Sequence, residues 1–96
     1  MSHETSMSGI RAALVRLNVS ADDMANASTE GHVDHRVVNG SRAGGGVDAH
    51  IERTDQPVSL EQETVERVVA AHELKANSAV LRAQTAMDDT IIDLLA

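Results

Sequence analysis

The segment SLEQETVERVVAAHELKANSAVLRAQTAMDDTIIDL, residues 59–94, contains no glycine or proline and is typical of one long helix. Ser59 begins a capping box with Gln62, three residues later, which is a common helix start. At 1.5 Å per residue such a helix would be roughly 50 Å long. A compact domain of 96 residues does not cover that length, so another surface is expected to cover part of it.

Apolar and small residues recur along this helix at a spacing close to 3.5, the repeat that pairs helices in coiled coils. The alanines in the middle of the stripe would allow a second helix to approach closely. The stripe predicted to pack or to carry assembly consists of Val65, Val69, Ala76, Ala79 and Ala83.

A second stripe, within residues 7–26, predicts a first helix. Its spacing of four, three, four and three residues is that of a coiled-coil seam. Ser8 is the expected N-cap, and the turn-forming residues of segment 26–31 are expected to end the helix near residues 25–27. The apolar residues of this stripe are Ile10, Leu14, Leu17, Ala21 and Met24.

Residues 32–57 have a different character, because two short runs rich in β-branched residues flank the glycine-rich segment 40–46. This pattern predicts a β-hairpin, although a hairpin this short is marginal in water and the segment could equally stay disordered until assembly. The expected architecture is therefore mainly α, one domain in which two helices form an antiparallel coiled coil. Its parts are a helix and turn (residues 1–31), the insertion (32–57) and the long helix (58–96).

The composition limits both the core and the classes of partner. The chain has no Phe, Tyr, Trp or Cys, so neither aromatic side chains nor disulfides contribute to stability. An isolated monomer is expected to be marginal, as suits a subunit that completes its core against neighbours. A net charge of −7 argues against nucleic acid binding. The polar first residues and the lack of a long apolar run argue against a secretory signal and against membrane insertion.

Two segments carry a family resemblance. Residues 8–31, SGIRAALVRLNVSADDMANASTEG, have a glycine–aliphatic opening, a helix and then the pattern A-N-x-x-T-x-G. They resemble the N-terminal signature of bacterial flagellar basal-body rod and hook proteins. Residues 64–95 are similar to the C-terminal helix of that family, and residues 45–57 loosely match its G-G-V stretch. The family usually has asparagines at Asp22 and Asp23 and aromatic residues at His32 and Leu74, and the chain is short. It therefore resembles a short, divergent proximal rod protein.

This resemblance implies a structural protein of flagellar motility that polymerises through its terminal helices. The implied partners are like or homologous axial subunits and the flagellar type III export apparatus. The implied location is the periplasmic rod of the basal body, reached without a cleavable signal peptide. The resemblance also implies a set of residues that contact neighbouring subunits: Asn26, Thr29, Gly31, Ala76 and Asn77. The alternative roles of these residues are helix termination and small-residue packing.

Neither an enzyme nor a cofactor-dependent protein is expected, because a chain of this architecture lacks the volume for a pocket that holds a nucleophile, a base and an acid. Five polar residues of the insertion have side chains that bind metals, and a hairpin would bring them together. These residues are His32, Asp34, His35, His50 and Glu52. The alternative interpretation is that they lie on the solvated surface and bind no metal. Two other functions stay open: a helical adaptor that binds export or rod components, and a small metal-binding protein.

Overall fold

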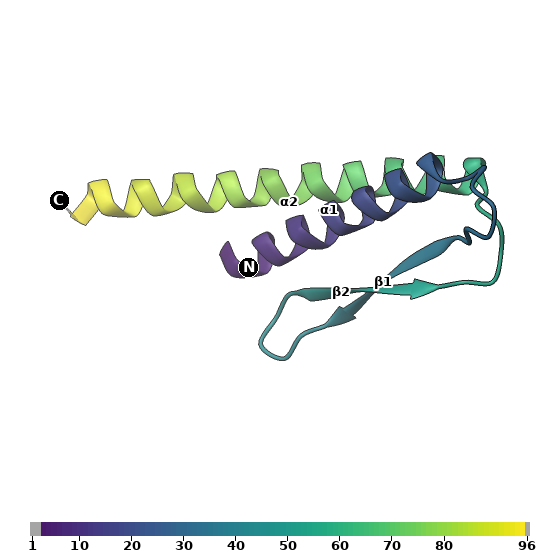
Figure 1. Cartoon of the computed structure of the whole chain (residues 1–96). Helices are drawn as coiled ribbons and strands as arrows, with labels where there is room; N and C mark the ends of the chain where they lie inside the picture. The colour runs from purple at the N-terminus through teal and green to yellow at the C-terminus, as the bar shows by residue number, and fades with distance from the viewer. Residues whose placement is uncertain (1–2, 96) are drawn as a thin grey trace.

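The computed structural model describes residues 3–95 as two helices with a two-stranded antiparallel sheet between them in sequence (Figure 1). This confirms the mainly helical class and the hairpin insertion, rather than a disordered one. The elements are α1 (His3–Ala25), β1 (His35–Ser41), β2 (Val47–Arg53) and α2 (Leu60–Leu95).

The molecule is elongated, with extents of 62 × 25 × 15 Å. Its radius of gyration is 17.1 Å, whereas a compact domain of this length has about 12.5 Å. His3 lies 3.2 Å from Asp88, while the Ser20 hydroxyl donates to the Glu63 carbonyl, so the two helices run in opposite directions. Because α2 has 36 residues and α1 has 23, the C-terminal end of α2 extends past α1 (Figure 1).

Neither helix within residues 3–95 is both long enough and apolar enough to cross a lipid bilayer.

The two predicted helix starts have different outcomes. Ser59 caps α2 as expected, because its hydroxyl accepts the Gln62 N–H at 3.3 Å. The prediction for Ser8 is wrong, since α1 already begins at His3 and Ser8 is buried within it. The Ser8 hydroxyl donates to the Thr5 carbonyl at 2.7 Å and accepts the Val47 N–H at 3.1 Å. Ser8 therefore attaches the hairpin to α1.

The hairpin pairs His35 with Arg53 at one end and Ser41 with Val47 at the other. Its loop is closed by a hydrogen bond of 3.1 Å from the Arg42 N–H to the Gly46 carbonyl. Three consecutive glycines, residues 44–46, have φ values of 88°, 104° and 93°, which L side chains rarely adopt. A Cβ on Gly46 would also lie 2.6 Å from the Ser8 hydroxyl oxygen. Glycine thus permits both the turn and its contact with α1.

The core is small, because the buried apolar side chains among the described residues are Ala12, Ala13 and Ala70. Small and polar side chains fill the interface between the helices, at positions that repeat every seven residues. Gly9 illustrates the close approach, since a Cβ there would lie 2.5 Å from Oδ1 of Asn77. The accessible surface is 6543 Å², against about 5,300 Å² expected for a monomer of this mass. The chain therefore buries little apolar area by itself.

The two predicted apolar stripes do not form this interface. The α1 side is made by Ser6, Ala13 and Ser20, and the α2 side by Glu63, Ala70 and their heptad neighbours. The apolar stripes lie beside this interface, because the residues of α1 that contact α2 and the hairpin are small or polar. Ile10, Leu17 and Met24 are half-buried, and the exposed members are Leu14, Ala21, Val65, Val69, Ala76, Ala79 and Ala83.

Candidate functional site

Three carboxylates and two imidazoles gather where the end of α1, the start of α2 and the segment before β1 meet. Asp23 comes from the last turn of α1 and Glu63 from the first turn of α2. His32, Asp34 and His35 come from the segment that leads into β1. We call this set the carboxylate–histidine cluster: Asp23, His32, Asp34, His35 and Glu63.

Asp23 is at the centre of the cluster and is fully buried. Its Oδ1 lies 2.8 Å from both Nε2 of His32 and Nδ1 of His35. Its Oδ2 accepts the backbone N–H of His35, also at 2.8 Å. Because an ionised carboxylate only accepts hydrogen bonds, each ring nitrogen carries a proton at this contact. Asp23 thus fixes both imidazoles and the first residue of β1.

Asp34 and Glu63 lie on the other side of Asp23. One carboxylate oxygen from each of the three residues lies within 4.8 Å of the others. Asp34 is only 9% exposed, and its Oδ1 is buried without a hydrogen-bond partner among the described residues. Its backbone is anchored by Thr54, whose N–H and hydroxyl both donate to the Asp34 carbonyl, at 3.0 and 2.9 Å. The backbone from which this carboxylate extends is therefore fixed.

The environment shifts two carboxyl groups in opposite directions. Burial opposes ionisation of Asp23, but hydrogen bonds from His35 and His32 outweigh it and hold the pKa of Asp23 below its usual value. Burial raises the pKa of Glu63 to about 7, and the neighbouring Asp34 and Asp23 carboxylates add to this shift. At neutral pH the Glu63 carboxyl is therefore divided between its protonated and ionised forms.

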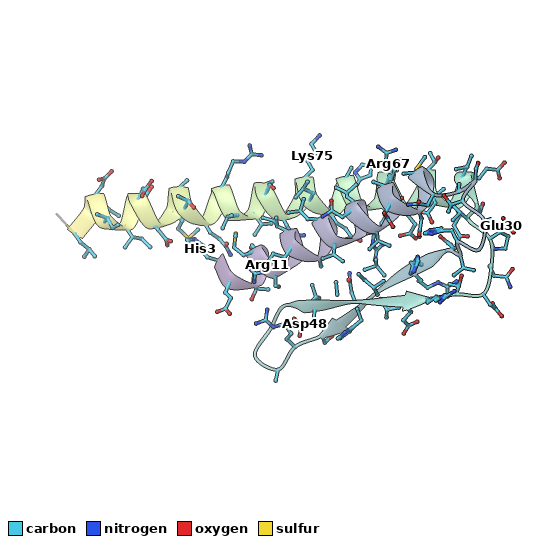
Figure 2. The ribbon with its side chains drawn as sticks, in the orientation of Figure 1. His3, Arg11, Glu30, Asp48, Arg67 and Lys75 are labelled. Carbon is cyan, nitrogen blue, oxygen red and sulfur yellow. The ribbon has the colours of Figure 1, made fainter. Side chains whose placement is uncertain are left out.

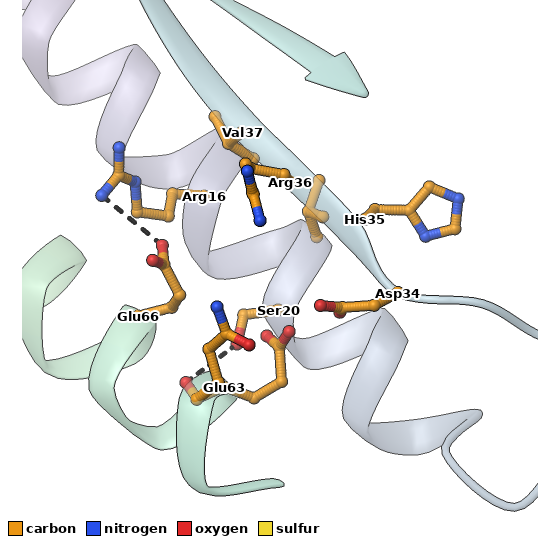
Figure 3. A pocket seen from close by; sticks show the side chains of 10 residues that line it. Arg16, Ser20, Asp34, His35, Arg36, Val37, Glu63 and Glu66 are labelled. Atoms are coloured by element: carbon orange, nitrogen blue, oxygen red, sulfur yellow. Dashed lines mark hydrogen bonds and ion pairs between the residues drawn. The ribbon is translucent and has the colours of Figure 1, made fainter. Parts of the chain in front are cut away.

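A cavity of about 20 Å³ opens beside the cluster. In Figure 3 the carboxylates of Asp34 and Glu63 point toward one another within it. Its volume admits about one water-sized atom, far less than an organic substrate needs. Arg16 also lines it, but the Arg16 guanidinium pairs with Glu66 at 3.5 Å and Glu73 at 3.6 Å.

The structure brings together part of the metal-ligand set expected from the sequence. His32, Asp34 and His35 are in the cluster, whereas His50 and Glu52 are exposed on β2 and lie outside it. His32 and Asp34 precede the hairpin strands, because β1 begins at His35. The remaining members of the cluster, Asp23 and Glu63, come from the two helices and were not predicted as metal ligands. The sequence signals that could have identified them are the acidic pair 22–23 and the glutamates of segment 61–66.

The residues of the family-like turn make local contacts. Asn26 Nδ2 donates to the Asp22 carbonyl at 2.9 Å, and the Thr29 N–H donates to the Asn26 carbonyl at 2.9 Å. Gly31 has a φ of 82° and completes the turn. Asn77 is half-buried opposite Gly9, and Ala76 is exposed. Contacts of these residues with other subunits stay a prediction.

A second candidate feature is a row of exposed apolar side chains along one side of α2. Their exposed fractions range from 37% for Val69 to 80% for Leu94. Figure 2 shows that, among residues 3–95, no other segment lies beside the end of α2 beyond His3. We call this row the α2 apolar face: Val65, Val69, Val80, Met87, Ile91 and Leu94.

No protein-family model matches the chain, and no significantly similar protein is found among curated sequences. The resemblance to axial flagellar proteins accordingly rests on the motifs of the chain alone.

Proposed function

We propose that this protein is a structural subunit that assembles with like or homologous chains through the exposed faces of its helices. The observation that carries the proposal is the α2 apolar face, which continues onto an end of α2 that has no partner within residues 3–95. Large exposed apolar patches of this kind mark interaction surfaces.

The energetics favour assembly over a monomer. Full burial of a Val, Leu, Ile or Met side chain contributes about 1.5–3 kcal/mol, and the α2 apolar face offers six such side chains. Within the described chain, by contrast, only alanines are buried among the apolar residues. A partner that covers the α2 apolar face therefore adds hydrophobic stabilisation that the described chain does not obtain by itself.

The pairing of the helices suits this role. The seven-residue repeat of small residues supports an antiparallel coiled coil of α1 and α2 within the chain. With that interface formed, Leu14, Val65 and Val69 stay exposed and are available to the helices of neighbouring chains. The two predicted stripes would then act between subunits.

The motifs at both ends support a more specific form of the proposal. The segments 8–31 and 64–95 point to the rod of the bacterial flagellar basal body, in the periplasm, with delivery by the flagellar export apparatus.

Sedimentation velocity of the full chain over a wide concentration range, with far-ultraviolet circular dichroism, tests assembly. We expect large species and a rise in helix content as the concentration increases. Val69→Asp should remove the large species, because an unpaired buried charge costs about 3–5 kcal/mol. Thr85→Asp, which adds the same charge on another side of α2, should leave them. A helical monomer at every concentration would favour the adaptor function instead.

A further inference from the structure

The carboxylate–histidine cluster contains a buried polar group that the fold itself does not satisfy. Oδ1 of Asp34 has no hydrogen-bond partner among the described residues, although Asp34 is more than nine-tenths buried. Leaving a buried charged acceptor unpaired is costly, so such a group usually has a partner that protein atoms alone do not show. Asp23 is also an acceptor when ionised, so of the two neighbouring carboxyl groups only Glu63, in its protonated form, can donate to Asp34.

The ligand geometry fits a cation. One atom each from Asp23, His32 and His35 lies within 4.8 Å of the other two, and Asp23, Asp34 and Glu63 form a second set of the same kind. Asp23 belongs to both sets. The two protons that join the imidazoles to Oδ1 of Asp23 occupy the place that a metal ion would take between the same three atoms.

The charges also fit a cation. Three carboxylates share this buried region with two imidazoles, and the nearby Arg16 guanidinium is already paired with Glu66 and Glu73. Two imidazole nitrogens together with carboxylate oxygens are ligands typical of Zn²⁺ and other first-row transition metals. Sites for Mg²⁺ and Ca²⁺ consist instead of oxygen ligands.

We propose that the carboxylate–histidine cluster binds one divalent transition-metal ion of the Zn²⁺ class, with Asp23, His32 and His35 as ligands and with the Asp34 carboxylate, which neighbours Asp23, as a supporting negative charge. This inference goes beyond the assembly function and does not rest on it. The ion joins the end of α1 to the segment that leads into β1. Because an ion that binds the folded chain contributes its binding free energy to folding, it stabilises a fold whose apolar core is small.

Isothermal titration calorimetry on the full chain, stripped of metal with EDTA and then dialysed, tests the site with ZnCl₂ and, for comparison, MgCl₂. We expect one Zn²⁺ per chain, much weaker binding of Mg²⁺, and proton release that is revealed by repeating the titration in a buffer of different ionisation enthalpy. Asp34→Asn preserves the shape of the side chain and should weaken Zn²⁺ binding at least about tenfold.

His50→Ala and His72→Ala are matched controls, because both histidines are exposed and lie outside the cluster. Both variants should bind Zn²⁺ like the wild type. Circular dichroism of each metal-free variant checks its helix content, and His32→Gln replaces Asp34→Asn if the latter does not fold. Three results would overturn the proposal: no binding of Zn²⁺, an affinity unchanged in the cluster variants, or an affinity lost in either control.

Discussion

The two ends of the helical pair have opposite chemistry. At the base, where the carboxylate–histidine cluster lies, charged side chains are buried: Asp23 is 0% and Glu63 is 3% exposed. At the free end, residues 86–95 of α2, the apolar side chains are exposed, with Leu94 and Leu95 at 80% and 82%. Soluble domains usually have the reverse distribution. The base is thus held by directional polar contacts within the chain, whereas the free end has apolar surface that no other part of residues 3–95 covers.

The largest effect is expected at the free end. Ile91→Asp should abolish self-association, because a charge placed in an apolar contact between chains has no partner. The affinity between chains should fall at least about a hundredfold, since about 3 kcal/mol corresponds to that factor. Sedimentation velocity measures the loss. Thr85→Asp is the control, and equal losses in the two variants would show that net charge, not the α2 apolar face, controls association.

At the base, Asp23→Ala should reduce the free energy of unfolding by about 3 kcal/mol, because it leaves the His35 N–H and both imidazoles without their acceptor. Urea denaturation of the metal-free chain measures the change. Asp22→Ala removes an exposed neighbouring carboxylate and should change stability by less than about 0.5 kcal/mol. Similar losses in both variants would mean that the cluster does not organise the base.

A pH series on the metal-free chain sharpens the description of the base. The pKa of Glu63 is raised in the folded chain to about 7, so the folded state binds this proton more tightly than the unfolded state does. Its contribution to stability is fully present below the unfolded pKa of about 4.5 and is lost as pH rises through about 7.

Between about pH 5.5 and about pH 8.5, the Glu63→Gln variant should therefore lose less stability than the wild type. Thermal melts in EDTA at the two pH values measure the difference. Glu61→Gln changes an exposed glutamate in the same helical turn and should behave like the wild type. A Glu63→Gln variant with the pH dependence of the wild type would contradict the burial of this carboxyl.

The smallest effect is expected where the hairpin loop contacts α1, between the two ends. Gly46→Ala and Gly44→Ala both place a side chain at positive φ, which costs about 1–2 kcal/mol. Only Gly46→Ala also displaces the Ser8 hydroxyl, so it should cost about 1 kcal/mol more. Urea denaturation compares the two variants, and equal costs would show that the Ser8 contact with Val47 adds nothing.

Much of the fold follows from local sequence. The long helix is predicted from the absence of helix breakers after Ser59, and the end of α1 from the turn residues of segment 26–31. The hairpin is predicted from the glycines of segment 44–46, and all three lie nearly where the structure has them. Each of these signals acts over a few residues, through capping or backbone conformation. The start of α1 was missed because Ser8, a good cap by type, makes a contact with Val47 that is distant in sequence.

The helix interface and the full cluster were less predictable. Periodicity identifies the most apolar stripe of a helix, but α1 and α2 meet through Ser6, Ala13, Ser20 and their partners. A polar interface has no hydrophobic signal in the sequence. In the same way, His32 and His35 are near one another along the chain, whereas Glu63 joins them only because α2 folds back along α1.

Amide hydrogen exchange, measured residue by residue at low and at high protein concentration, tests the contrast between the two ends most directly. In the dilute chain we expect slow exchange at the base, around Asp23 and Glu63, and fast exchange in residues 86–95. At high concentration the free end should become protected while the base changes little. A free end that is already protected in the dilute chain, or that stays unprotected at every concentration, would contradict the account.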